Sequence, residues 1–228
     1  MHTHFALDFD GTISPVDTTD LLLAAFADPS WEDIEAEWRA GRIGSRECLA
    51  RQVALIRARP QDLHAALSGV TLDPDFIRFA TAAWLRRATL SVVSDGFDLA
   101  IVHLLHANGI DLPVVSNRMI QVGADGWRAE FSTQGERCGS GTCKCAAVPA
   151  NRRVILIGDG RSDFCLARKA DFVLAKGELA AFCAAQGIPH KKIAGFADAL
   201  RFITSRDRPP VTPALSSFTR PQFEDLHA

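Results

Sequence analysis

Apolar residues in this chain fall in short unbroken runs that are separated by longer segments with helical periodicity. Runs with the length and composition of buried strands lie at residues 5–7, 90–94, 112–116, 153–158 and 171–175. Segments with helical periodicity follow most of them, at residues 98–107, 162–169, 178–185 and 196–203. Because strands alternate with helices, the pattern predicts an α/β fold built on a doubly wound, mostly parallel (Rossmann-like) sheet.

Two segments interrupt this alternation. Successive amphipathic helices are predicted at residues 18–27, 30–40, 45–58, 60–67 and 73–87. Residues 119–122 and 127–131, which flank a glycine-containing turn, have the pattern of a β-hairpin. We therefore expect a core formed by residues 1–14 and 88–205, a helical insertion at 15–87, and a proline-containing extended tail at 206–228.

The first apolar run leads directly into two carboxylates. Asp8 and Asp10 follow residues 5–7, at the carboxyl end of the expected strand, where open α/β sheets bind ligands. Residues i and i+2 of an extended chain point the same way, so both side chains can share one polar pocket while Phe9 packs behind. Gly11 then allows the chain to turn, and a simple turn would also explain this sequence. Chemically, the pair suits a nucleophile beside a proton donor.

Later segments supply polar groups of a matching kind. One further apolar run ends in a serine that precedes an expected helix start, and another leads into a pair of aspartates. A lysine lies between these two runs in the sequence. These residues are Ser94, Asp95, Gly96, Lys144, Asp159 and Asp163. Carboxylate oxygens in small number suit Mg²⁺, and a lysine with a serine and backbone N–H groups suits the oxygens of a phosphate. The set therefore indicates phosphoryl transfer, which depends on positioning and electrostatics.

In order and spacing, these segments resemble motifs I to IV of the haloacid dehalogenase (HAD) superfamily, over residues 4–176. The resemblance implies that Asp8 is the nucleophile and that Asp10 is the general acid and base. The dehalogenase branch lacks the second acid of motif I. Because this chain has Asp10 at that position, it resembles the phosphatases instead. The chain is thus expected to be a HAD phosphatase whose helical insertion is a small C1-type cap that closes over the site.

The same resemblance implies the ligands of the phosphate and of the metal. Expected phosphate-binding residues are Thr12, Ser94, Asp95, Gly96 and Lys144. Expected Mg²⁺ ligands are Asp8, the Asp10 carbonyl and Asp159, with Asp163 near the metal. The expected reaction is hydrolysis of a small-molecule phosphomonoester through an aspartyl-phosphate. A phosphotransferase and a catalytically silent HAD-like binding protein are the alternatives.

Two residues bear on the substrate. Asp17 and Arg46 lie where the phosphoserine phosphatase family places an acid for the substrate amine and an arginine for its carboxylate. Asp17 could equally cap the helix that begins at Thr18, and Arg46 could be a solvated charge. Ser94-Asp95-Gly96-Phe97 and the cysteines before Lys144 resemble instead the methionine-salvage phosphatases that act on 2-hydroxy-3-keto-5-methylthiopentenyl-1-phosphate. We therefore expect a phosphatase of this branch, with phosphoserine phosphatase as an alternative.

Three cysteines gather around Lys144, at positions 138, 143 and 145. Their spacing differs from that of common zinc knuckles, so a zinc or redox site competes with a structural loop that presents Lys144. A thiol beside a lysine could still oxidise easily.

Bulk properties agree with a small enzyme. The chain has 228 residues, 47% of them hydrophobic, and a formal net charge of −2. It can therefore bury a full core and gives no reason to expect nucleic acid or an anionic membrane as a partner. The first strand begins near His4, and no apolar run is as long as a membrane span, so we expect a cytoplasmic protein. The six cysteines support this location if they are reduced thiols.

Overall fold

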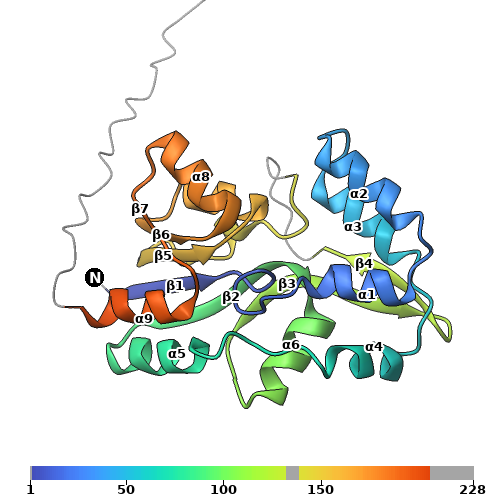
Figure 1. The fold of residues 1–228 in the computed structure, drawn as a ribbon, viewed down its shortest axis with the longest axis horizontal. Helices are drawn as coiled ribbons and strands as arrows, with labels where there is room; N and C mark the ends of the chain where they lie inside the picture. Colours follow the sequence, from blue (N-terminus) through green and yellow to red (C-terminus); the bar gives the residue numbers. More distant parts are fainter. Residues whose placement is uncertain (1, 132–138, 206–228) are drawn as a thin grey trace, which may run out of the picture.

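The computed structural model describes residues 2–131 and 139–205. Its centre is a seven-stranded sheet with the strand order β4-β3-β2-β1-β5-β6-β7. The strands are β1 (Thr3–Leu7), β2 (Thr89–Phe97), β3 (Val114–Val122), β4 (Gly126–Glu130), β5 (Arg153–Gly158), β6 (Phe172–Ala175) and β7 (His190–Lys192). Neighbouring strands pair in parallel except for β3 and β4, which form the expected antiparallel hairpin. The predicted α/β fold is confirmed (Figure 1).

Strand β1 lies in the middle of the sheet and pairs with β2 on one side and β5 on the other. The chain builds the sheet outward from β1 through β2 and β3, and then returns to the opposite side of β1 with β5. This change of direction creates a topological switch point, where doubly wound sheets bind ligands beyond the carboxyl ends of the strands.

Helices cover both faces of the sheet. One face carries α4 (Pro60–Leu67), α5 (Phe76–Leu85), α6 (Asp98–Ala107) and α9 (Phe196–Thr204). The other carries α7 (Phe164–Ala167) and α8 (Gly177–Gln186). Side chains of β1 alternate between these layers: Phe5 and Leu7 belong to the core beneath α5 and α9, and Ala6 to the core beneath α7 and α8. The period-two pattern of a doubly covered strand thus fixes both cores.

The helical insertion divides between two places. Helices α4 and α5 pack on the sheet face beside α6 and α9. Helices α2 (Trp31–Arg39) and α3 (Ser45–Val53) pack on each other and stand on the opposite side of the sheet, near β4 (Figure 1). Helix α1 (Thr18–Phe26) leads from the first motif toward them. The assignment of residues 15–87 as a cap stays a prediction. Within this segment, α2 and α3 are the helices beside the site.

No helix among the described residues has both the length and the apolar composition needed to cross a membrane. The predicted tail at 206–228 and Cys138 lie outside the described residues.

Candidate active site

Three of the predicted motifs meet because their strands are neighbours. Asp8 directly follows β1, Ser94 lies near the end of β2, and Asp159 follows β5. Since β1 pairs in parallel with both other strands, the three carboxyl ends lie at the same edge of the sheet. A cavity of about 210 Å³ opens there, and its walls include Asp8, Asp10, Ser94 and Asp159.

Lys144 does not line this cavity; its side chain is fully buried behind Asp8, which does. Its Nζ donates to Asp8 Oδ1 at 2.7 Å and to Asp163 Oδ1 at 2.7 Å. Burial alone would lower the pKa of Lys144, but the carboxylates of Asp163 and Asp8 outweigh it and raise that pKa. The lysine is therefore a fixed cation at neutral pH. It is presented by η1 (Lys144–Ala146), a short 3₁₀ turn, where we expected a helix to follow.

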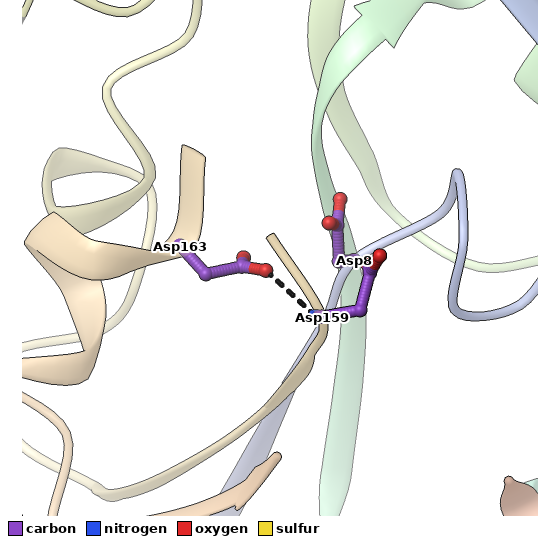
Figure 2. Close-up of side chains that lie close together, drawn as sticks. All are labelled: Asp8, Asp159 and Asp163. Atoms are coloured by element: carbon purple, nitrogen blue, oxygen red, sulfur yellow. Dashed lines mark hydrogen bonds between the residues drawn. The ribbon is translucent and has the colours of Figure 1, made fainter. Parts of the chain in front are cut away.

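Carboxylates outnumber the lysine at this edge. Oxygens of Asp8, Asp159 and Asp163 lie within 4.8 Å of one another (Figure 2). The Asp163 carboxylate also accepts from the backbone N–H of Asp159 at 3.0 Å, and the Thr12 hydroxyl donates to Asp159 Oδ1 at 2.9 Å. Burial, followed by the neighbouring carboxylates, raises the pKa of Asp8 and of Asp159. The raised values show that the cluster lacks positive charge.

A divalent cation fits this cluster. Within the described part of the chain, the group of His, Cys, Asp or Glu side chains placed to share an ion is Asp8, Asp159 and Asp163. All its donors are hard oxygens, which suit Mg²⁺ or Ca²⁺ better than soft metals. The Asp10 carboxylate is not part of this group, and the predicted metal contact of the Asp10 backbone carbonyl stays a prediction.

Asp10 has a different environment from Asp8. Its Oδ1 accepts from the Thr18 backbone N–H at 2.8 Å and from the Thr18 hydroxyl at 2.7 Å. Its Oδ2 faces Gly96, where an added Cβ would lie 2.4 Å from Oδ2, so only glycine fits. Burial, then the charge of Asp17, raises the pKa of Asp10 to about 7. Asp10 can therefore hold a proton at neutral pH and aim it at the β2 end.

Gly11 completes the first motif. Its φ is +71°, a left-handed conformation that glycine adopts without cost. A Cβ there would lie 2.3 Å from Asp159 Oδ2, so any side chain would displace the expected metal ligand. The Gly11 carbonyl accepts from Lys176 Nζ at 2.7 Å, which ties the first motif to the loop after β6.

The Asp95 side chain points into a polar network beside the site. Its Oδ1 accepts from the Thr142 backbone N–H at 2.6 Å and from Asn117 Nδ2 at 3.4 Å. Asn117 also donates to the Asp95 carbonyl at 2.6 Å, and its own Oδ1 accepts from the Thr142 hydroxyl. Asp95 thus joins the β2 end to the segment before Lys144. The sequence reasoning missed Asn117, although its position at the end of an apolar run, in β3, was a usable signal.

The two predicted substrate residues have different positions. Asp17 lines the cavity and also caps α1, because its carboxylate accepts from the backbone N–H groups of Thr19 and Asp20. Arg46 is not among the cavity-lining residues. Its Nη2 donates to the Gly141 carbonyl at 3.4 Å and its guanidinium stacks over Phe131.

The outer wall of the cavity carries acids that the sequence reasoning did not find. Asp20 from α1 and Glu35 from α2 line it together with Asp17, and the Trp38 indole forms part of the same wall. Burial, followed by Asp17 and Glu35, raises the pKa of Asp20 to about 6. No local pattern distinguished these residues from solvated helix charges, because only the packing of α1, α2 and α3 brings them to the site.

Comparison with known proteins decides the family. The family model for haloacid dehalogenase-like hydrolases matches residues 5–168. The chain belongs to this family. The predicted superfamily is therefore confirmed, and the matched segment contains all the expected catalytic and ligand residues.

Curated relatives of this HAD hydrolase carry one name, 2-hydroxy-3-keto-5-methylthiopentenyl-1-phosphate phosphatase. The protein from Exiguobacterium sp. is 27% identical over 207 residues, which cover 87% of this chain and 95% of the relative. The protein from Geobacillus kaustophilus is 28% identical over 216 residues, covering 85% and 91%. With the family match, these relatives confirm the predicted enzyme class, a HAD-family phosphatase.

Solved structures agree with the fold. An apo phosphoserine phosphatase superposes with a TM-score of 0.69 at 17% identity, covering 89% of this chain and 99% of the other. A phosphoserine phosphatase described as a phospho-aspartyl intermediate analogue superposes with a TM-score of 0.68 at 19% identity, covering 88% and 98%.

The cysteines of this HAD hydrolase form a covalent link that the sequence did not predict. Cys145 and Cys165 are joined in a disulfide, and the Cys143 sulfur lies 3.6 Å from that of Cys145. The condition that all six cysteines are reduced thiols is therefore not met by these two residues. The bond joins η1, which presents Lys144, to α7, which follows Asp163. It therefore connects the same two segments as the buried Lys144–Asp163 ion pair.

Reduction of this disulfide is expected to lower the melting temperature by about 6–12 °C. The bond closes a loop with a sequence separation of 20, for which chain entropy predicts about 3 kcal/mol, and each kcal/mol shifts Tm by roughly 2–4 °C at this size. Calorimetry with and without a dithiol reductant measures the shift. Cys145→Ser should melt like the reduced protein and ignore the reductant, whereas Cys183→Ser should still respond. Equal melting temperatures in both states would contradict a stabilising bond.

The chelated protein is expected to lose stability as the pH rises from about 4 to about 7. The folded-state pKa is about 7 for Asp10 and about 6 for Asp20, against about 3.9 in an unfolded chain. Each group thus stabilises the fold below its unfolded pKa, and that contribution is lost as pH rises through the folded pKa. Thermal melts in EDTA should show Tm falling by several degrees across this window. Asp10→Asn should show a smaller fall in Tm. A Tm that rises with pH would contradict the raised pKa values of Asp10 and Asp20.

Proposed function

We propose that this protein is a Mg²⁺-dependent phosphomonoesterase that hydrolyses a small-molecule phosphate through an aspartyl-phosphate on Asp8. The observation that carries the proposal is the pairing of two carboxylates with different roles at one sheet edge. Asp8 is ion-paired with the buried Lys144, and Asp10 has a pKa of about 7 and faces the β2 end. The two carboxylates thus differ in position and in partner, a lysine for Asp8 and Thr18 for Asp10, as a nucleophile and a proton donor require.

In the first step, the phosphate of the substrate binds between Lys144 and the Ser94–Gly96 segment. Lys144 Nζ and the Ser94 hydroxyl donate to phosphate oxygens and offset their charge. An Asp8 oxygen attacks phosphorus, the ester P–O bond breaks, and the leaving alkoxide takes the proton from Asp10. The products of this step are the alcohol and the phosphorylated Asp8.

In the second step, Asp10 acts as a base. Its carboxylate takes a proton from a water molecule, and the water oxygen attacks phosphorus of the phosphorylated Asp8. The Asp8 O–P bond breaks, inorganic phosphate leaves, and both carboxyl groups return to their starting states. Thr18 keeps Asp10 in place through both steps, because it donates two hydrogen bonds to the oxygen that does not face Gly96.

Mg²⁺ would be held by Asp8 and Asp159, with Asp163 beside them, where it would neutralise charge between nucleophile and phosphate. Lys144 alone does not balance the cluster, because it is one cation against three clustered carboxylates and is already bonded to two of them. Thr12 orients Asp159 through its hydroxyl, which gives Thr12 a positioning role in addition to the phosphate contact expected from the sequence.

Chelation is expected to abolish phosphate release reversibly. EDTA should lower the rate to the background level, and Mg²⁺ in excess should restore it, because the carboxylate cluster otherwise repels an incoming phosphate. Initial rates of phosphate release over a Mg²⁺ titration measure this. Full activity after exhaustive chelation would contradict the metal requirement, and restoration by Zn²⁺ alone would point to a different ion.

A second, narrower candidate is a phosphomonoester that carries an amine. Asp17, Asp20 and Glu35 line the outer wall of the cavity with Trp38, a setting that suits an ammonium group. The phosphoserine alternative needs in addition a cation for the substrate carboxylate. Arg46 is engaged with Gly141 and Phe131, whereas Arg161 lines the cavity and lies over the Trp38 ring. The substrate named for the curated relatives carries no amine, so the acidic wall favours a different substrate for this chain.

A substrate panel tests these alternatives. It should include p-nitrophenyl phosphate, phosphoserine, phosphoethanolamine, glycerol phosphate and 2-hydroxy-3-keto-5-methylthiopentenyl-1-phosphate, with phosphate release measured in Mg²⁺. An amine-bearing substrate would be supported if phosphoethanolamine gave the highest kcat/KM and if Asp20→Asn lowered that kcat/KM selectively. Release without amine preference would leave the general phosphatase in place. No release by folded, metal-loaded protein would favour a silent binding protein, and transfer to an added alcohol would identify a phosphotransferase.

A further inference from the structure

A second cavity lies at the amino ends of the central strands, opposite the active site at their carboxyl ends. It has a volume of about 170 Å³ and is lined by the first residues of β1 and β5, by the segment between α5 and β2, and by the last turn of α9. Figure 1 shows these elements together, near the point where the chain begins. Strand β1 has five residues, so it separates this cavity from Asp8 by roughly 17 Å.

Arginines dominate the polar lining of this cavity. Arg86, Arg87 and Arg153 contribute to its wall together with His2, and no aspartate or glutamate among residues 2–131 and 139–205 does. Within the described segments, these three guanidinium groups form no ion pair with a carboxylate, whereas arginines such as Arg59 and Arg128 do. In a chain with a net charge of −2, three uncompensated arginines around one hollow are a local exception.

One of these arginines has an unused buried donor. Arg153 Nε is inaccessible to solvent and has no hydrogen-bond partner within the described residues. A buried N–H without an acceptor is costly, and native proteins rarely keep one that no partner ever satisfies. The described residues therefore leave this donor without an acceptor beside the cavity.

The backbone at Arg87 is a second unusual feature of this cavity wall. Arg87 has φ +58° and is the non-glycine residue with positive φ among those described. It follows the end of α5, where its N–H donates to the Trp84 carbonyl and that of Ala88 donates to the Ala83 carbonyl. This is a Schellman ending, in which glycine is the favoured residue. An arginine here gives up stability, and such strain in a cavity wall is typical of binding sites.

We propose that this arginine cavity, formed by Arg86, Arg87 and Arg153, is a binding site for a small oxyanion of the phosphate or carboxylate type. Guanidinium groups bind both kinds of anion through paired N–H donors, and the missing carboxylates leave the positive field uncompensated. The apolar part of the wall, from Phe5 and Ile203, leaves room for a short carbon skeleton. The site does not depend on the proposed phosphatase activity, because it lies at the opposite sheet edge.

Thermal melts in EDTA test the site without interference from the active site. With metal ions removed, the carboxylate cluster of the active site repels anions. Inorganic phosphate, sulfate and succinate should each be titrated at constant ionic strength against sodium chloride. In the wild-type protein, an anion bound in this cavity should raise Tm by about 3–6 °C at about ten times its dissociation constant, and above that constant Tm should rise with the logarithm of the anion concentration. The dissociation constants fitted to the succinate and phosphate titrations distinguish a carboxylate ligand from a phosphate ligand.

Two variants and a control make the result decisive. Arg87→Gly should raise Tm without anion by about 2–4 °C, because glycine suits the left-handed position, and should weaken the anion response at least tenfold in concentration. Arg153→Gln should weaken it similarly, and Arg128→Gln, an equal charge change on the hairpin, should leave it intact. A Tm rise that is equal in all four proteins, or one that sodium chloride reproduces, would overturn the proposal, as would the absence of any rise.

Discussion

Asp8→Asn is expected to lower phosphate release by at least about 10³-fold with every substrate, because the variant has no carboxylate oxygen to attack phosphorus. The change removes one hydrogen-bond partner of Lys144 but leaves the Asp163 ion pair, so the lysine stays in place. It also removes a carboxylate whose pKa burial and its neighbours raise, which relieves repulsion in the cluster. We therefore expect a folded protein with an unchanged or higher Tm in EDTA, measured by thermal melts beside initial rates of phosphate release.

Its control is Asp125→Asn, the same chemical change in the exposed hairpin turn, which should keep full activity. Acid-quenched mass spectrometry during turnover adds a direct readout, since wild-type protein should carry one phosphoryl group on the peptide that contains Asp8. Activity of Asp8→Asn within tenfold of the wild type would refute the nucleophile assignment. A phosphoryl group on any other peptide would do the same.

The sequence predicted the parts of the site that depend on strand ends. An apolar run followed by a carboxylate specifies both a buried strand and the residue at its carboxyl end, so the pattern alone was enough to place Asp8 and Asp159. The parallel sheet then brings such positions together whatever the details of the helices. The same reasoning predicted the hairpin, whose turn glycines and alternating pattern are local signals.

Other features depend on contacts between distant segments and carry no local signal. The Cys145–Cys165 bond requires η1 to lie against α7, and the spacing of the cysteines alone does not show this. Asp20 and Glu35 look like ordinary helix charges until α1 and α2 pack beside the site. Arg46 illustrates the opposite case: its position in the sequence suggested a substrate contact, but its guanidinium turns to Gly141 and Phe131.

Asp10→Asn is expected to lower kcat/KM for an alkyl phosphate by about 10²–10³-fold, because the leaving alkoxide loses its proton donor. Asparagine can still accept the two hydrogen bonds from Thr18, so the local fold should persist. With a pKa of about 7, Asp10 is protonated on the acid side of neutrality. The wild-type rate with an alkyl phosphate should therefore decline as the pH rises above about 7, and Asp10→Asn should lack this limb.

The leaving group separates the two roles of Asp10. The p-nitrophenolate ion needs little help from an acid, so Asp10→Asn should still phosphorylate Asp8 with p-nitrophenyl phosphate and then stall, since no base activates the water. Stopped-flow absorbance should show a burst of about one p-nitrophenol per protein followed by slow turnover. An equal loss for both substrates without a burst would show that Asp10 acts mainly on binding. Asp125→Asn, run in parallel, should show the wild-type time course.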